Sequence, residues 1–401
     1  MFTKKPEKYL LHVVLICEDG ELMEMNGRKF PIIILVSLTL LLIAAMPARA
    51  EVKPIVLAHS KGALAPDPQL KALTNLTYVE WRVVLGELTS ADLSEVKMLI
   101  MSKSDPAAEY STAELEAIAS WFSQGGKTLW VAADGDQRTS QLRQYTANEV
   151  LEKVGSKLRI EDCSVEDVTS NAGTGYRVLG ISTNVNPIFR FLVTGVERAL
   201  FHAPSLVIGY MDGEYVDLNS EDVENVYIIM TTSNDGVVMD SSEPAPNIME
   251  AGAEGSFPLM VFEIDWAKKN TIIATGESPF DQDEGMYKPE LQNPGRYGPT
   301  GNWQQGAVLM ENILKYATVF GDELKSLQTE VWDNEDAIER LTTDKTSLQG
   351  QVTTLTSEKT QLQTDLTAAQ ISASTMQIVA VAALVVGVVA GYFVGPMIKK
   401  Q

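Results

Sequence analysis

The sequence predicts a layered α/β head of the Rossmann or flavodoxin-like kind, followed by a long coiled-coil helix and one C-terminal transmembrane helix. Between residues 51 and 320, short apolar runs alternate with amphipathic segments of helical period, which is typical of βαβ units. An apolar heptad repeat over residues 324–369 indicates a coiled coil. Residues 378–398 carry no charge and are numerous enough to cross a hydrocarbon core.

These patterns divide the chain into segments. We expect a leader in residues 1–50, the head in 51–320, the stalk in 321–375, the transmembrane helix in 376–398 and a cytoplasmic tail in 399–401.

The leader has the features of a secretory signal peptide. Residues 30–46 are apolar, Arg28-Lys29 precedes them, and Ala48-Arg49-Ala50 follows as a cleavage site. Without cleavage the segment is a signal anchor, and a start at Met23 or Met25 would give a leader of more ordinary length. Because Arg28-Lys29 and Lys399-Lys400 both favour the cytoplasmic side, the head is expected outside the cytoplasm in each case.

Composition excludes several kinds of site and partner. The chain carries a net charge of −21, most of it in the head, which disfavours nucleic acid and anionic lipid as partners and is compatible with divalent cations or basic surfaces. The same charge also serves solubility. Cys163 is the one cysteine after the leader, so an intrachain disulfide and a cysteine zinc site are excluded. This sparse use of cysteine favours a prokaryotic source.

The first half of the head is expected to contain three strands and two helices. The strands are residues 52–58, 96–101 and 128–133. The first helix opens at a capping box, Ser111-Thr112-Ala113-Glu114, runs to Phe122 and stops at Gly125-Gly126. A second helix is expected near residues 147–154.

The second half is expected to be richer in short strands and turns. A helix over residues 305–320 closes the head and passes through Gly321 into the stalk. The strands expected here are residues 157–160, 206–210, 226–231, 259–263 and 271–274.

Several motifs give the head a resemblance to a known family. They are Ile55-Val56-Leu57-Ala58-His59-Ser60-Lys61-Gly62, Tyr110-Ser111-Thr112-Ala113-Glu114-Leu115, Gly125-Gly126-Lys127, Asn186-Pro187-Ile188, Thr194-Gly195-Val196, Gly276-Glu277-Ser278-Pro279-Phe280 and Asn312-Ile313-Leu314. In this order they resemble the extracytoplasmic class I glutamine amidotransferase-like domains of archaeal and bacterial membrane proteins, which are ABC-transporter auxiliary or gliding-motility-like. The resemblance implies an amidotransferase-like fold and an ABC-type permease or another envelope protein as partner.

The chain departs from this family at two positions. The family commonly has an aspartate shortly before the histidine and another after the late glycine, where this chain has Val56 and Glu277. True amidotransferases of this fold also place a nucleophilic cysteine on a glycine-flanked turn. Cys163 lies instead among acidic residues, which disfavour the thiolate. The sequence therefore predicts a head without catalytic residues.

Polar groups follow three of the expected strands. If the strands are adjacent and parallel, these groups share one edge of the sheet, where ligands of open α/β sheets bind. Such loops are also polar simply because they face water. The candidate ligand-binding residues are His59, Ser60, Lys61, Asp134, Asp136, Glu277 and Ser278. A divalent cation is expected, if anywhere, at Asp281, Asp283 and Glu284, although this run lacks the third acid and the final glutamate of an EF-hand loop.

The stalk is expected to form a parallel homodimer. Its a and d positions are mostly β-branched residues or leucine, with polar Asn334, Lys345 and Lys359 between them, which suits two strands. The alternative is a lone helix that folds back on the head. In the membrane, a stripe of small residues would let two helices approach. The candidate dimerisation residues are Leu327, Val331, Ile338, Leu341, Leu348, Val352, Leu355, Leu362, Gly387, Gly391 and Gly395.

Taken together, the sequence predicts a membrane-anchored binding or scaffold protein with a catalytically inactive head and no cofactor beyond a divalent cation. One alternative is a hydrolase or amidotransferase-like enzyme that uses His59 with the strand-end carboxylates. Another is a sensor, which would need a membrane partner because only three residues follow the transmembrane helix.

Overall fold

The computed structural model describes residues 52–61, 76, 78–102, 108–137, 141–280, 286 and 304–398. The chain divides into two units, Met1–Lys53 and Pro54–Gln401. All the helices and strands described below belong to the second unit.

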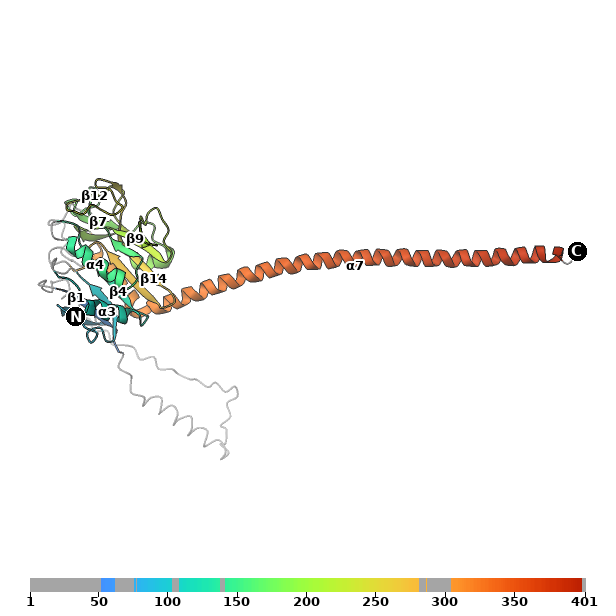
Figure 1. Ribbon diagram of the computed structural model, residues 1–401, viewed down its shortest axis with the longest axis horizontal. Helices are drawn as coiled ribbons and strands as arrows, with labels where there is room; N and C mark the ends of the chain where they lie inside the picture. Colours follow the sequence, from blue (N-terminus) through green and yellow to red (C-terminus); the bar gives the residue numbers. More distant parts are fainter. Residues whose placement is uncertain are drawn as a thin grey trace, which may run out of the picture. The chain divides into compact units, whose positions relative to one another are not determined.

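The head is built on a nine-stranded mixed sheet (Figure 1). Its first five strands are parallel neighbours, in the order of a doubly wound α/β fold. The remaining four are antiparallel. From edge to edge the strands are β2 (Glu80–Leu85), β1 (Ile55–Ser60), β3 (Val96–Met101), β4 (Thr128–Ala132), β15 (Asn270–Thr275), β14 (Pro258–Asp265), β11 (Val226–Thr231), β7 (Arg177–Ile181) and β8 (Arg198–His202).

Helices cover both faces of this sheet. Successive side chains of a strand point to opposite faces, so Val56 and Ala58 pack in one core while Ile55 and Leu57 pack in the other. The first core also contains side chains of η2 (Pro187–Val193) and α6 (Gly306–Lys315). The second contains side chains of α3 (Thr112–Phe122) and α4 (Gln141–Lys153). The apolar runs that predicted strands are therefore continuous because both faces are buried.

Two small sheets complete the head. One has the order β10-β9-β5 and the other β13-β12-β6. The expected strand at residues 157–160 does form, but it pairs with β9 and not with the main sheet. The strands are β5 (Leu158–Ile160), β6 (Ser164–Asp167), β9 (Val207–Met211), β10 (Glu214–Val216), β12 (Gly236–Met239) and β13 (Glu254–Gly255).

Local signals predicted the first helix well. The Ser111 hydroxyl accepts from the Glu114 backbone N–H, and the Glu114 carboxylate accepts from the Ser111 N–H. The helix ends at Phe122, and Gly125 and Gly126 follow with φ of 82° and 63°, values that favour glycine. Strand β2 was not predicted, because it is an edge strand whose residues are mostly exposed or half-buried.

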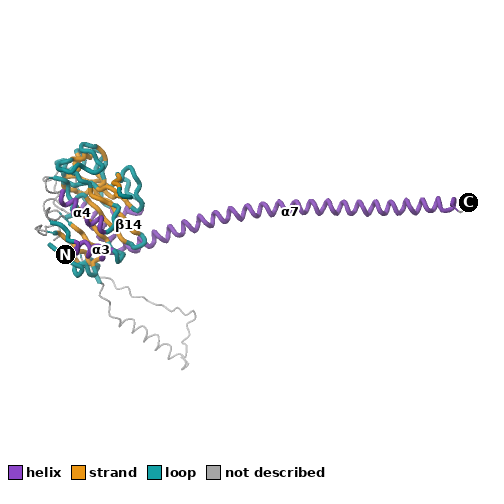
Figure 2. The backbone as a smooth tube through the Cα atoms, viewed as in Figure 1, coloured by secondary structure: helices purple, strands orange, loops and turns teal. Residues whose placement is uncertain are grey.

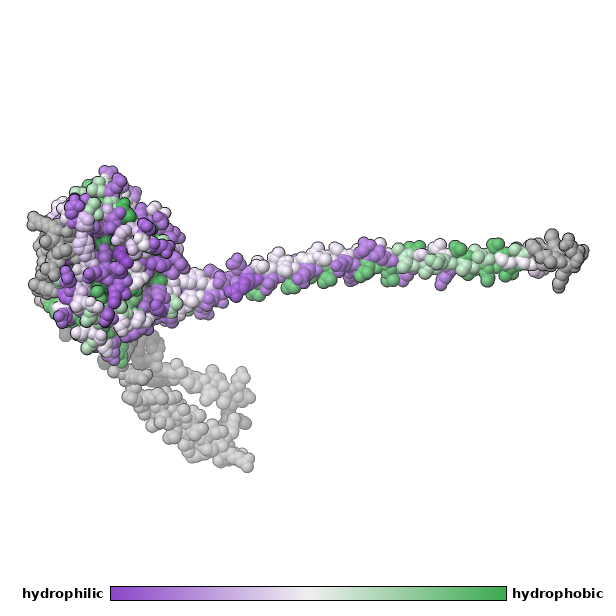
Figure 3. All heavy atoms as spheres, in the orientation of Figure 1, coloured by the Kyte–Doolittle hydropathy of each residue, from purple (hydrophilic) through white to green (hydrophobic). Residues whose placement is uncertain are grey.

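The head continues into a long C-terminal helix. After α6, a π-helical turn, η4 (Tyr316–Phe320), leads into α7 (Gly321–Ile398), and the chain is helical from Gly306 through Tyr392. Among the described residues, this one helix is long and apolar enough to cross a membrane. Figure 3 shows the change along it from polar residues to apolar ones.

The first turns of α7 contact the head. Asp322 pairs with Lys97 at 2.5 Å. The buried Lys325 donates to the Lys269 carbonyl at 2.8 Å. Trp332 packs edge-on against Trp266, with ring centroids 4.8 Å apart. Figure 2 shows the helix as one uninterrupted element.

Candidate functional site

The groups predicted at the strand ends lie at one edge of the main sheet. β1, β3, β4 and β15 are successive parallel neighbours, so their carboxyl ends meet at the same edge. His59, Ser60 and Lys61 end β1, Asp134 and Asp136 follow β4, and Glu277 and Ser278 follow β15. All of them are buried except Lys61, which is half-buried.

His59 is held by both nitrogens of its ring. Its Nε2 lies 2.8 Å from the Gly86 carbonyl oxygen and must donate to it. Its Nδ1 lies 3.0 Å from the Tyr110 hydroxyl, which then is the donor. Burial lowers the pKa of His59, more than the Gly86 contact raises it. The side chain is therefore a neutral imidazole that joins β1 to the β2 turn and to Tyr110.

Glu114 accepts four hydrogen bonds next to this histidine. Its donors are Lys61, the Ser111 hydroxyl and backbone N–H at 2.9 and 2.8 Å, and the Leu88 N–H at 3.0 Å. Burial opposes ionisation, but these donors outweigh it and lower the pKa of Glu114 to about 2. Lys61 also lies 5.1 Å from the centre of the Tyr110 ring. The ion pair thus fixes the start of α3 against β1.

We expect Glu114→Gln to destabilise the protein by about 3 kcal/mol near neutral pH, at 1.36 kcal/mol per pKa unit. Because the folded-state pKa lies below the ordinary value of 4.5, this stability is present above pH 4.5 and is lost as pH falls towards 2. Denaturant unfolding at pH 7 and pH 3 should therefore show a large difference from wild type only at pH 7. The exposed Glu116 lies on the same helix, and Glu116→Gln should leave both curves unchanged.

The two aspartates after β4 also hold structure together. Asp134 pairs with Arg143 of α4 at 2.7 Å. Asp136 accepts from the Ser164 hydroxyl at 2.5 Å and from the backbone N–H groups of Ser241 and Ser242 at 2.6 and 3.2 Å. A carboxylate in such a position anchors the loops that donate to it.

The end of β15 is packed against a second chain segment. Gly276 and Ser205 exchange a backbone hydrogen bond of 3.0 Å, with the Ser205 N–H as donor. A Cβ on Gly276 would lie 1.9 Å from the Ser205 oxygen. Ser278 accepts from the Phe280 N–H at 3.1 Å. Only glycine therefore fits directly before the buried Glu277.

A cavity of about 20 Å³ lies at this edge, enough for about one water molecule. Within the described chain, the predicted groups make contacts that fix loops to the sheet and do not converge on a larger space. The cavity is lined by Met101, Ser102, Tyr110, Val131, Ala132, Arg143, Thr146 and Ala147.

The proposed cation site lies outside the described residues. This holds for Asp281, Asp283 and Glu284 alike. Within the described ranges, no group of three or more His, Cys, Asp or Glu side chains could hold a metal ion.

Cys163 and His202 are the other two residues considered for chemistry. The Cys163 thiol is fully buried, and burial, followed by the charge of Glu161, raises its pKa well above the ordinary value. The reactive thiolate is therefore disfavoured. His202 was expected in the core, but it is half-buried at the end of β8 and packs edge-on against Tyr176 at 5.5 Å.

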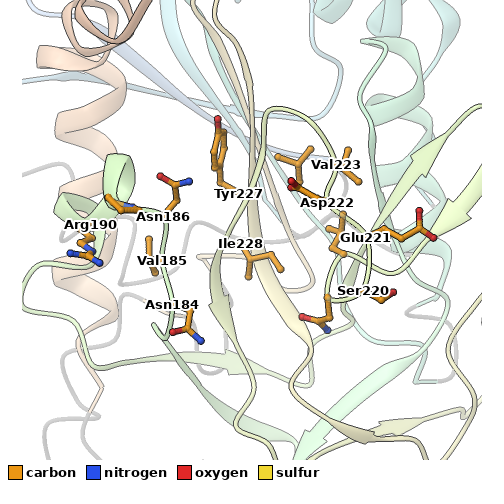
Figure 4. Close-up of a pocket in the computed structure, with 14 residues that line it drawn as sticks. Asn184, Val185, Asn186, Arg190, Ser220, Glu221, Asp222, Val223, Tyr227 and Ile228 are labelled. Carbon is orange, nitrogen blue, oxygen red and sulfur yellow. The ribbon is translucent and has the colours of Figure 1, made fainter. Parts of the chain in front are cut away.

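A larger cavity lies elsewhere in the head, beside β11. Its volume is about 690 Å³, within the range of ligand sites. Figure 4 shows Asn184, Asn186 and Arg190 on one side, Ser220, Glu221 and Asp222 on the other, and Ile228 between them. We did not predict this cavity. The sequence signals that could have indicated it are Asn184 and Asn186 after β7 and the acidic turn before β11.

Comparison with known proteins gives one structural match. No family model matches the chain, and no curated protein matches it. One solved structure is similar, the crystal structure of a "putative GMP synthase" protein from Thermoplasma acidophilum. It has 10% sequence identity and a TM-score of 0.33, and the alignment covers 70% of this chain and 98% of that one. At this TM-score the match carries no argument about what this chain does.

Proposed function

We propose that this chain is a non-catalytic binding protein whose head stands on a dimeric stalk, anchored by one membrane span with the head outside the cytoplasm. The observation that supports this most is an exposed apolar stripe on α7 that runs directly into the uncharged span. Leu341, Leu348 and Leu355 on this stripe are 66%, 59% and 62% exposed. No described residue of the same chain covers them.

A second copy of α7 is the partner that fits this stripe. The heptad spacing keeps a and d residues on one face over the whole stalk, and pairing two such faces buries them. Both copies are anchored at the same end, so they must run parallel. In that arrangement Lys345 and Lys359 at a positions can pair with Asp344 and Glu358 at g positions of the other copy. The Gly387, Gly391 and Gly395 stripe lets the membrane segments follow the same pairing.

The contacts at the sheet edge support a non-catalytic head. A general base must be free to reach a proton on the substrate, whereas both nitrogens of His59 are already engaged. Cys163 is buried and its thiolate is disfavoured. The partner that we propose is an ABC-type permease or another envelope protein in the same membrane, and this step rests on the sequence resemblance.

Two cysteine variants test the dimer and the topology together. Leu355→Cys lies at a d position and Ser357→Cys at the opposite f position, both in full-length protein with Cys17 replaced by serine. In intact cells under mild oxidation, Leu355→Cys should form a disulfide-linked dimer, because d residues of a parallel dimer face each other. Ser357→Cys should react with a membrane-impermeant maleimide, because the stalk lies outside.

The same pair of variants supplies the controls. Ser357→Cys should give little disulfide, since f positions face away from the partner. Equal cross-linking of both would mean random collision and would remove the support for a dimer. Labelling of Ser357→Cys only after the cells are lysed would place the stalk inside the cell.

His59→Ala separates the binding function from the enzyme alternative. The change leaves the Gly86 carbonyl and the Tyr110 hydroxyl without their partner and opens a cavity, so we expect a loss of about 3 kcal/mol. The melting temperature should fall by roughly 6–10 °C. His202→Ala, at a half-buried position, should cost less. A variant at His59 with wild-type stability would instead leave this residue available for catalysis.

A further inference from the structure

The large cavity exists because two neighbouring strands of the main sheet separate. β7 and β11 are paired only where Ile181 lies opposite Thr231. Beyond Ile181 the chain turns away at Asn184, whose φ is 58°, and enters η2 at Pro187. The first half of β11 is therefore paired with β14 on one side and borders the cavity on the other.

The backbone of β11 presents hydrogen-bonding groups to this cavity. The Ile264 N–H donates to the Asn225 carbonyl of the adjoining segment. In an antiparallel ladder the residues that bond to one neighbour alternate with those that point away. Asn225 and Tyr227 thus face β14, whereas Val226 and Ile228 face away from it. The Val226 N–H bonds to Val223, which leaves the Val226 carbonyl and both backbone groups of Ile228 at the cavity.

Such an edge can accept one more strand. An open strand edge pairs readily with an extended segment of another chain, and main-chain bonds of this kind are a common mode of peptide recognition. The edge is recessed between the wall of Asn184, Asn186 and Arg190 and the wall of Ser220, Glu221 and Asp222. These walls leave room for one extended segment and protect the edge from a second folded sheet.

The charge around the cavity selects the kind of segment. Residues 199–267 contain 13 Asp and Glu residues and no Lys or Arg. Among them, Glu221 and Asp222 line the cavity, and both side chains are exposed. Arg190 is the one cationic residue in the lining. A basic segment is therefore attracted to this side of the head, while an acidic one is repelled.

We propose that the cavity beside β11 binds an extended basic segment of a partner protein, which adds as a strand to the free edge of β11. This rests on the proposed binding function and names the chemistry of the partner. Val226 and Ile228 supply main-chain bonds, and Glu221 and Asp222 pair with a Lys or Arg side chain of the segment.

A random peptide library displayed on phage, selected against the full-length protein in nanodiscs, tests this proposal. Recovered peptides should be rich in Lys and Arg. Synthetic copies should bind roughly fivefold more weakly to a variant carrying Glu221→Gln and Asp222→Asn, because rim charges of this kind contribute about 1 kcal/mol. The control variant carries Glu214→Gln and Asp212→Asn, which make the same charge change in the same acidic stretch but outside the cavity lining. Its affinity should stay within twofold of wild type.

The strand geometry is tested on the peptide, so that folding of the protein is not at issue. Only one edge of an added strand bonds to β11, and its residues alternate. N-methylation of alternate residues in one register should abolish binding, and in the other register should change it little. Ile228→Pro should also abolish binding, since it removes an N–H that faces the cavity and no bond to β14.

Several outcomes would overturn the proposal. They are equal tolerance of both methylation registers, selected peptides without basic residues, recovery of no peptide that depends on Glu221 and Asp222, and binding of neutral oligosaccharides on a glycan array at this site. Each is independent of the cysteine cross-linking of the stalk. A cross-linked dimer without peptide binding would therefore refute this inference and leave the proposed function standing.

Discussion

Gly276→Ala is expected to prevent the head from folding stably. The added methyl group would lie 1.9 Å from the Ser205 oxygen, and backbone atoms cannot turn aside as a flexible side chain can. The Gly276 N–H also donates to the Leu259 carbonyl at 3.2 Å, so the residue is held from two sides. Overpacking that forces backbone shifts costs several kcal/mol, and we expect a loss above about 4 kcal/mol. Yield of extracted protein, protease resistance and melting temperature should all fall.

Gly350→Ala is the matched control for this change. No atom lies within 4 Å of the position where its Cβ would be, and the residue is exposed in the middle of α7. Alanine there should raise helix stability by up to about 1 kcal/mol, the difference in helix propensity between the two residues. If Gly276→Ala melted like wild type, the close approach of β15 to the segment around Ser205 would be wrong.

The parallel half of the sheet could be predicted from the sequence because burial leaves a plain signal there. β1, β3, β4 and β15 are buried on both faces, so each is a short run without polar residues. Once these strands are expected to be parallel, their ends must share an edge. The positions of His59, Asp134 and Glu277 follow from that argument alone.

The partners of those residues could not be predicted. His59 bonds to Gly86 and Tyr110, which are 27 and 51 residues away, and Lys61 pairs with Glu114 across 53 residues. Such contacts depend on how helices and turns pack onto the sheet. A polar strand end that looks available for a ligand in the sequence is therefore engaged in holding the fold.

The cavity beside β11 was beyond prediction for a related reason. Its existence depends on β7 leaving the sheet after Ile181, which is a property of the assembled sheet and has no local sequence pattern. What the sequence does contain is the charge. The long stretch without Lys or Arg is enough by itself to mark this side of the head as acidic.

Replacing both Leu348 and Leu355 by aspartate is expected to separate the dimer into monomers. Both residues occupy d positions, and in the proposed dimer each would bury its side chain against the other copy. Burying one leucine is worth about 2 kcal/mol, so four lost leucines per dimer remove roughly 8 kcal/mol, before the cost of burying charge is added. Light scattering of the full-length protein in detergent should show the mass of one chain in place of two.

The control places the same charges on the other side of the helix. Thr343 and Ser357 are f positions that face away from the proposed partner, so a variant carrying Thr343→Asp and Ser357→Asp should remain dimeric at the same concentrations. A stable dimer in the Leu348 and Leu355 variant would mean that the two copies are joined by the membrane segment or the head. The apolar stripe of the stalk would then need a different partner, and since these leucines are exposed along the whole described helix, that partner would have to be another protein.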